Sequence, residues 1–199
     1  RGVRIATLFY FFNQAGLFAF LGTWGTPWLV HVFEMSIATA SSLMVMTVIG
    51  IMIGGISTGW ISDKIGRRRL PMIIAASVHS VLWGCMIFPW QQPLGVGALR
   101  CIFLLLGFTN TAFVLSWSVA KELTSKKYTG LAISVLNAAG FFAIAVTTSI
   151  MGMVIDYYSF LPLEAAYRRA FSLGLICSVF SLLFALLIPE TGFMKRKEK

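Results

Sequence analysis

Six long apolar runs, separated by short polar segments, decide what this 199-residue chain can fold into. They cover residues 5–30, 37–61, 70–90, 96–120, 128–155 and 170–188. A helix needs about 20 apolar residues to cross a bilayer. Asp, Glu, Lys and Arg are absent from five of the runs, and the fourth contains only Arg100. The runs therefore predict an all-α integral membrane protein with six transmembrane helices in one domain. Membrane-spanning strands are excluded, because their apolar and polar residues would alternate along the chain.

The basic residues lie on one side of that predicted bundle. The sequence has 16 Lys and Arg against 7 Asp and Glu, a net charge of +9. Six spans place both ends of the chain on the same side as loops 62–69 and 121–127, and these segments hold 13 of the 16 bases. By the positive-inside rule this side is cytoplasmic. The bases do not alternate with aromatic residues on a polar surface, so the predicted partner is the lipid bilayer and not a nucleic acid.

Residues that would bind a metal or a cofactor are sparse. Cys85, Cys101 and Cys177 lie far apart, in or beside apolar runs, and form no C-x-x-C pair. His31 and His79 form no H-E-x-x-H pattern, and His79 is expected to pack inside the bundle. We therefore expect no cofactor and no enzyme activity. A membrane protein that only mediates interactions or signalling remains an alternative.

One polar loop between the second and third apolar runs carries a specific pattern. Residues 59–69 read GWISDKIGRRR, which matches G-x-x-x-D-[RK]-x-G-R-[RK]-[RK] at every defined position. This pattern resembles the cytoplasmic-loop signature of the major facilitator superfamily, where it joins the second and third helices of each six-helix half. Residues 23–29 (TWGTPWL), 130–137 (GLAISVLN) and 189–191 (PET) are similar to the seventh, eleventh and twelfth helices of bacterial members. The chain thus resembles the C-terminal half of such a transporter.

That resemblance implies a 3+3 inverted repeat of helices and a missing N-terminal six-helix half as partner. The complete protein would be a secondary active transporter of the bacterial inner membrane. It would move a small organic solute by alternating access, coupled to a proton or another cation. No Asp or Glu lies within the six runs, so an acid that titrates during coupling is expected in the missing half. The alternative is a six-helix protomer that pairs into a twelve-helix homodimer.

The resemblance also assigns the loop to a latch that biases the two access states. The candidate latch residues are Gly59, Asp63, Lys64, Gly66, Arg67 and Glu190. In the family the acid contacts the start of the eleventh helix in one state, where the helix dipole favours a carboxylate, and the arginine holds the acid in place. Here this implies that Asp63 contacts residues 128–131 and that Arg67 holds Asp63.

Other residues of the loop have simpler interpretations. Gly59 would allow a neighbouring helix to approach closely, and Gly66 would permit a tight turn. Arg68 and Arg69 are interpreted mainly as anchors at the membrane surface.

Polar side chains within the runs are candidates for a solute pathway, because such groups usually point into the bundle. By resemblance, the first, second, fourth and fifth spans line the cavity. The candidates are Asn13, Gln14, Trp24, Asn110, Trp117, Asn137 and Arg100. The alternative is hydrogen bonding between helices for the uncharged residues and snorkelling to the interface for Arg100. Gly50 and Gly54 have G-x-x-x-G spacing, which predicts a close helix contact.

Overall fold

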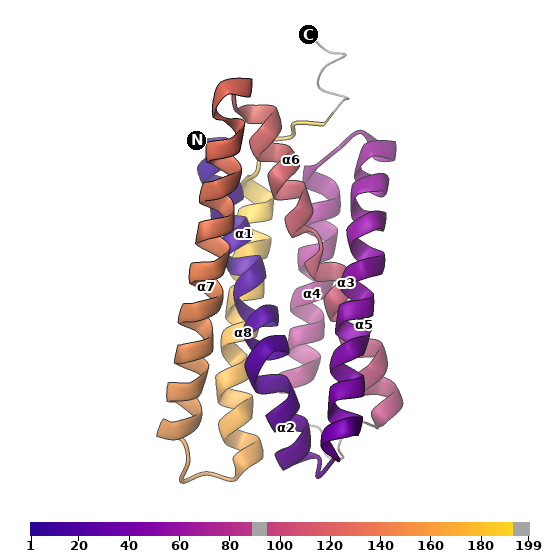
Figure 1. The fold of residues 1–199 in the computed structure, drawn as a ribbon, viewed down its shortest axis with the longest axis vertical. Coiled ribbons are helices and arrows are strands. Elements are labelled where there is room, and N and C mark those ends of the chain that lie inside the picture. Colours follow the sequence, from indigo (N-terminus) through magenta and orange to yellow (C-terminus); the bar gives the residue numbers. More distant parts are fainter. Residues whose placement is uncertain (89–94, 193–199) are drawn as a thin grey trace.

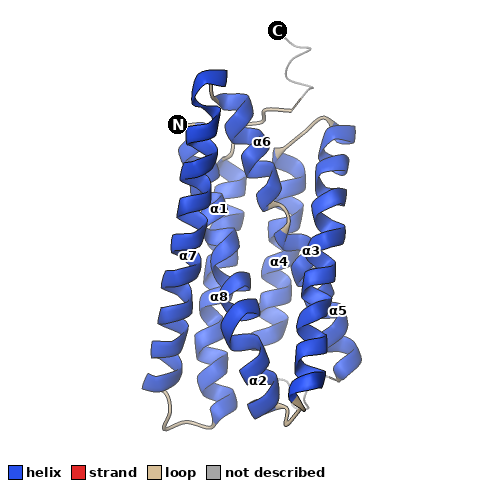
Figure 2. Ribbon diagram, in the orientation of Figure 1, coloured by secondary structure: helices blue, strands red, loops and turns tan. Residues whose placement is uncertain are grey.

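The computed structural model describes residues 1–88 and 95–192 as a bundle of long helices (Figures 1 and 2). The elements in chain order are α1 (Gly2–Ala19), the π-helix η1 (Phe20–Trp24), α2 (Gly25–Val32), α3 (Ile37–Ile65), α4 (Arg69–Ile87), α5 (Val96–Asn110), α6 (Phe113–Leu123), the 3₁₀ helix η2 (Lys126–Tyr128), α7 (Thr129–Tyr157) and α8 (Leu163–Leu187). Together they form six helices long and apolar enough to cross a membrane, and no strand occurs in the described residues. The predicted all-α fold with six spans is confirmed.

The connections between helices are sorted between the two ends of the bundle. Figure 1 shows the N-terminus, the α3–α4 turn and the α6–α7 connection at one end, where α8 also finishes. We call this the basic end, because Arg1 and loops 62–69 and 121–127 lie there. The α2–α3 and α7–α8 connections lie at the opposite end.

The boundaries of some helices depart from those of the apolar runs. The sixth span begins at Leu163, before its apolar run, so its first two turns carry charge. Arg168 Nη2 donates to Glu164 Oε1 at 2.5 Å, and the Arg169 guanidinium lies 4.4 Å from the centroid of the Tyr158 ring. Charged side chains at a helix end can reach water, so the helix can extend beyond the apolar run that predicted it. The predicted end of the third span, residues 89–90, lies outside the described residues.

Two spans are interrupted near their middle. The first passes from α1 through the single π-turn Phe20–Trp24 into α2, and the fourth breaks between Asn110 and Phe113. Backbone groups leave the regular i→i−4 hydrogen-bond pattern at such points, and π-turns are frequent at functional sites. Two predicted pathway residues, Trp24 and Asn110, lie at these interruptions.

Glycines allow the helices to approach closely at two contacts. A Cβ added at Gly50 would lie 2.0 Å from the carbonyl oxygen of Leu104 on α5, and one at Gly54 would lie 2.6 Å from that of Phe108. The close contact predicted from the G-x-x-x-G spacing is therefore confirmed, and it joins α3 to α5. A Cβ at Gly16 on α1 would lie 2.9 Å from the Cα of Gly174 on α8.

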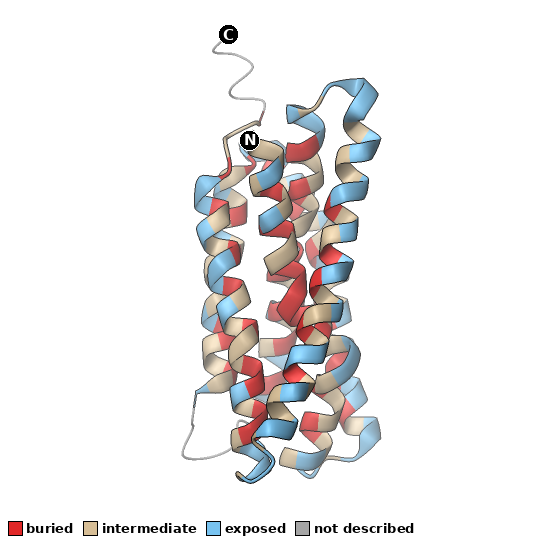
Figure 3. Ribbon diagram, turned by 90° about the vertical axis from the view of Figure 1, so that its left-hand side faces the viewer, coloured by how far each residue is buried: buried red, intermediate tan, exposed pale blue. Residues whose placement is uncertain are grey.

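Aromatic side chains fill the space between these helices. Phe20 lies at the centre of the main cluster, with ring centroids 5.2–6.0 Å away in edge-to-face geometry. Its partners are Trp28, Trp83, Phe103 and Phe171. Figure 3 shows the buried residues on the faces where helices meet and the exposed ones on the outer faces.

His79 is buried in the bundle, as expected. Its Nδ1 lies 2.9 Å from Thr109 Oγ1, and its Nε2 accepts a hydrogen bond from Trp83 Nε1 at 3.1 Å. Both ring nitrogens thus have partners, which ties α4 to α5.

Candidate gating network and solute pathway

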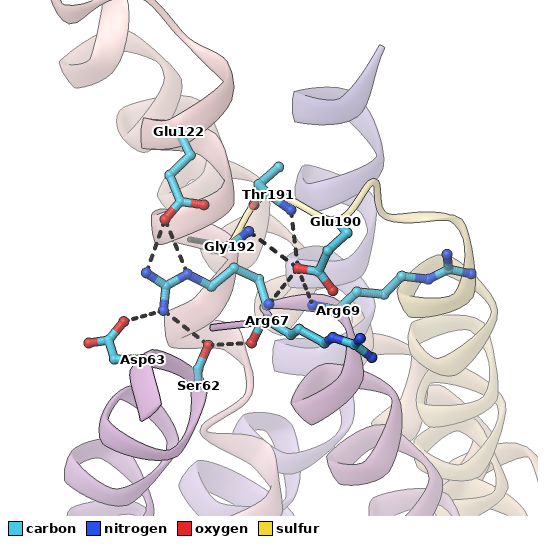
Figure 4. A network of polar contacts seen from close by, with 9 residues as sticks. Ser62, Asp63, Arg67, Arg69, Glu122, Glu190, Thr191 and Gly192 are labelled. Atoms are coloured by element: carbon cyan, nitrogen blue, oxygen red, sulfur yellow. Dashed lines mark hydrogen bonds and ion pairs between the residues drawn. The ribbon is translucent and has the colours of Figure 1, made fainter. Parts of the chain in front are cut away.

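Arg68 is the centre of a polar network at the basic end, and Figure 4 labels its partners Ser62, Asp63 and Glu122. It is the N-cap of α4, and only 6% of its surface is exposed. Its Nη1 donates to Asp63 Oδ1 at 2.5 Å and to Ser62 Oγ at 3.0 Å. Its Nε and Nη2 donate to Glu122 Oε1 at 3.1 and 3.0 Å. One guanidinium therefore joins the end of α3 to the end of α6.

The two carboxylates compensate for the burial of this cation. Burial lowers the pKa of the Arg68 guanidinium, but the hydrogen bonds and the negative charges of Asp63 and Glu122 together raise it by more, so the pKa lies above the ordinary value. The Asp63 side chain is 58% exposed and that of Glu122 is 23% exposed. Because water screens Asp63 more, the pair with Glu122 contributes more of the stabilisation.

Glu190 forms the second part of the network. Its Oε1 accepts hydrogen bonds from the backbone N–H groups of Arg68 at 2.6 Å and Arg69 at 3.4 Å. The same oxygen accepts from the N–H groups of Thr191 at 3.1 Å and Gly192 at 3.3 Å. A carboxylate from the end of α8 thereby satisfies the first N–H groups of α4, where the positive end of the helix dipole also favours it (Figure 4).

Gly66 makes the turn that brings these groups together. Its φ of 70° is left-handed, and its N–H bonds to the carbonyl oxygens of Ser62 and Asp63, which ends α3. The predicted tight turn at Gly66 is confirmed. Gly192 packs directly on this turn, since a Cβ there would lie 2.1 Å from the Gly66 carbonyl oxygen. Sequence reasoning missed Gly192, whose need for close approach only the fold reveals.

The arginine that holds Asp63 is Arg68 and not Arg67, so that part of the prediction is wrong. Arg67 is exposed, and its carbonyl oxygen accepts from Ser62 Oγ at 2.8 Å. Its side chain forms no ion pair with the described part of the chain. The interpretation of Arg68 as a surface anchor is wrong for the same reason: the turn at Gly66 directs it inward. Arg69 also bonds within the bundle, from Nη2 to the carbonyl oxygen of Leu186.

Two other latch candidates, Gly59 and Lys64, lie apart from the Arg68 contacts. A Cβ at Gly59 would meet no atom within 4 Å, so Gly59 does not serve a close contact within the described residues. Lys64 Nζ lies 4.9 Å from the centroid of the exposed Trp60 ring, one helical turn earlier. Among the described residues no hydrogen bond joins Asp63 to α7, and α3 and α7 stand at opposite sides of Figure 1. The contact of Asp63 with residues 128–131, expected in one access state, stays a prediction.

Three helices bring polar groups together around Asn137. Asn137 Oδ1 accepts from Tyr10 OH at 3.2 Å and from Trp117 Nε1 at 3.1 Å. The Tyr10 and Trp117 rings lie 6.1 Å apart, and Phe113 packs edge-to-face on both. Thus α1, α6 and α7 assemble one aromatic and amide cluster, which includes two of the predicted residues. Tyr10 was not predicted, because a tyrosine in an apolar run gives no sign of its partner.

The contacts of the other pathway candidates join helices. Asn110 Nδ2 donates to the Asn13 carbonyl oxygen at 2.8 Å and to Asn13 Oδ1 at 3.3 Å, and both residues are buried. Trp24 Nε1 donates to the Thr148 carbonyl oxygen at 3.0 Å, which ties η1 to α7. These contacts correspond to the alternative reading, hydrogen bonding between helices.

Gln14 and Arg100 differ from those residues. Gln14 is buried, and its Oε1 has no hydrogen-bond partner among the described residues. Arg100 is exposed on α5 and forms no ion pair with the described residues. Gln14 therefore remains a candidate for solute contact, and the exposure of Arg100 is compatible with snorkelling.

Known proteins share this sequence and architecture. Residues 6–199 match the Major Facilitator Superfamily. The chain is 27% identical over 158 residues to the cis,cis-muconate transport protein of Acinetobacter baylyi, covering 79% of this chain and 36% of that protein. The inward-open xylose transporter XylE of E. coli has a TM-score of 0.77 at 18% identity, covering 98% of this chain and 49% of XylE. XylE bound to 6-bromo-6-deoxy-D-glucose, a proton:xylose symporter, gives 0.78 at 20% identity, with 95% and 44% covered.

The chain thus spans about a third of the muconate protein and about half of the solved xylose transporters. A family match over nearly the whole sequence, together with six spans in the same arrangement, establishes the relationship. This chain belongs to the major facilitator superfamily of membrane transporters.

Proposed function

We propose that this chain is the C-terminal six-helix half of a secondary active transporter that moves a small organic solute by alternating access. The observation that carries the proposal is the superposition of nearly the whole chain on about half of a solved transporter. Rocking of two halves around a shared site requires a second six-helix unit, which is the principal partner proposed here. The basic end would face the bacterial cytoplasm, because the positive-inside rule places Lys and Arg there.

Two apolar faces support the existence of that partner. Ile56 and Trp60 on α3 are 81% and 62% exposed, and Phe141 on α7 is 73% exposed. These helices stand at opposite sides of the bundle in Figure 1. We infer that the second half and lipid together cover these faces, since an apolar face of this kind could not remain in contact with water.

The cluster of Tyr10, Trp117 and Asn137 is the proposed solute-contacting group of this half. Tyr and Trp combine an apolar ring with a polar tip, and the amide of Asn137 can exchange its present hydrogen bonds for bonds to a solute. Gln14 has a buried oxygen available for the same purpose. Such a group suits a small molecule with an apolar skeleton that carries hydroxyl or carboxylate groups.

The network around Arg68 is the proposed latch, with the arginine assignment revised. It joins the ends of α3, α4 and α6 and the segment after α8. Asp63 is the exposed member and can reach outside this half, which makes it the residue best placed to engage the partner in one access state.

Uptake by the full-length protein in proteoliposomes tests this function. The first solutes to test are cis,cis-muconate and xylose, because similar proteins carry these names. We expect accumulation of at least one small solute that depends on an imposed proton or cation gradient. Asn137→Leu should raise KM at least several-fold, whereas Ser149→Ala, an exposed site on the same helix, should not change it.

The alternatives make different predictions. Absence of any gradient-dependent flux over a broad panel of organic solutes would favour an interaction or signalling protein. Native mass spectrometry in lipid that finds two copies of this segment, with no second type of half, would favour the homodimer.

A further inference from the structure

A cavity of about 460 Å³ lies beside Arg68 at the basic end. Four parts of the chain converge on it: the start of α4, the end of α6 with its connection to α7, the start of α7, and the segment after α8. Arg68 and Glu122 of the proposed latch form part of its wall, whereas Tyr10, Trp117 and Asn137 of the proposed solute cluster do not line it.

The lining of the cavity carries more positive than negative charge. Arg68, Lys121 and Lys126 line it, against the single carboxylate of Glu122. Glu122 Oε1 already accepts two hydrogen bonds from Arg68. Neither Lys121 nor Lys126 forms an ion pair with any described residue. The two lysines therefore supply charge that the described side chains do not neutralise.

Hydrogen-bond donors from other elements surround the same space. Thr124, Thr129 and Thr191 contribute hydroxyls to the lining, and that of Thr129 donates to the Ser125 carbonyl oxygen at 3.2 Å. Thr191 Oγ1 is buried and lacks a hydrogen-bond partner among the described residues. The 29-residue α7 begins at Thr129, and its N-cap Tyr128 makes no capping hydrogen bond through its side chain. The positive end of a long helix thus lies at the cavity wall, together with the lysines.

We propose that this cavity binds a phosphate group, carried by a free phosphate compound or by a phospholipid headgroup at the membrane surface. A phosphate accepts several hydrogen bonds, and ammonium groups, hydroxyls and a helix N-terminus are the donors that suit it. The binding does not depend on the proposed transport function. Any effect on gating does depend on it, because a bound phosphate would lie beside the Arg68–Glu122 pair.

Thermal unfolding of the full-length protein in detergent tests the free-phosphate source. Sodium phosphate should raise Tm in a saturable manner relative to sodium chloride at equal ionic strength and pH, because a ligand of the folded state stabilises it. The double variant Lys121→Gln/Lys126→Gln should lose the rise. Lys127→Gln is the matched control, since Lys127 is adjacent in sequence but lies 5.4 Å from the Tyr128 ring and does not line the cavity.

Native mass spectrometry with phosphatidylglycerol tests the lipid source. Wild type and Lys127→Gln should retain more lipid than the double variant. Thr191→Val, which removes no charge but removes the hydroxyl that lacks a partner among the described residues, should weaken the response partially and serves if the double variant does not fold. A response to either source that the double variant loses supports the site. Equal responses in wild type and double variant, or no response to either source, overturn it. Because neither readout requires solute flux, failure of transport would leave this result interpretable.

Discussion

At the scale of single residues, Arg68 determines the arrangement of the basic end. Its guanidinium presents a planar set of donors that reaches Asp63, Ser62 and Glu122 simultaneously. Three consecutive arginines, Arg67 to Arg69, have equal charge, yet they point in three directions. The arginine that becomes buried is selected by the left-handed turn at Gly66 and by the position at which α4 begins, which makes Arg68 its N-cap.

Arg68→Gln should destabilise the full-length protein by about 1–3 kcal/mol, because it leaves Glu122 and Asp63 without their cation. This is less than for a fully buried pair, since both carboxylates remain partly exposed. Arg67→Gln is the matched control and should change the free energy of unfolding by no more than about 0.5 kcal/mol. Chemical or thermal unfolding in detergent measures the difference. Equal effects of the two substitutions would contradict the assignment.

Asp63→Asn should slow transport and leave solute affinity nearly unchanged, since the proposed latch acts on the access equilibrium and not on the solute site. The substitution removes charge at an exposed carboxylate while Glu122 keeps Arg68 paired, so stability should change by about 1 kcal/mol or less. Initial rates and solute Kd of the full-length variant measure the two effects. An unaltered rate would refute the latch.

At the scale of elements, the contact between α3 and α5 depends on the absence of side chains. Gly50 and Gly54 on α3 face Leu104 and Phe108 on α5, and Gly107 faces the Thr47 carbonyl oxygen. The buried hydroxyls of Thr58 and Thr111 lie 2.8 Å apart along the same contact. This pairing supports the interrupted fourth span, whose break places Asn110 against α1.

Gly50→Ala should destabilise the protein by about 1–3 kcal/mol, the usual cost of overpacking a well-packed contact. The new methyl group would lie 2.0 Å from a backbone oxygen, so α3 and α5 must separate. Gly55→Ala is the control, because a Cβ there meets nothing within 4 Å, and alanine favours helix by up to about 1 kcal/mol. Thermal unfolding of both variants measures the difference, and Gly50→Ala should have the lower Tm. An equal or higher Tm for Gly50→Ala would contradict the close contact.

At the scale of the whole molecule, the chain is one bundle of an architecture known from transporters that are about twice as long. Membership of a transporter family supports the prediction of a transport protein over that of an enzyme. The exposed Ile56 and Phe141 lie on the faces that we propose the second half and lipid to cover.

Residues 1–199 produced alone should insert into membranes and yet show no gradient-driven flux, because alternating access needs two halves around one site. Co-production with the remainder of the natural transporter should restore flux. Uptake assays on matched membranes measure both. Flux by the isolated segment would contradict the half-transporter proposal and favour the homodimer.

The sequence by itself determined the number of spans, the class of fold and the clustering of basic residues at one end. These features depend only on composition and spacing, because apolar runs are buried in lipid and consecutive spans place successive loops on alternate sides of the membrane. It also identified the loop at residues 59–69 and the turn at Gly66, because a left-handed φ suits glycine.

Only the tertiary structure decided which side chains meet. Glu122, Glu190 and Gly192 converge on the turn at Gly66 from segments more than fifty residues away, and Tyr10 meets Asn137 across the bundle. No local pattern encodes such contacts, since they depend on how helices rotate and approach, which the packing of glycines and aromatic rings sets. For this reason the sequence located the network but assigned its arginine to the wrong position.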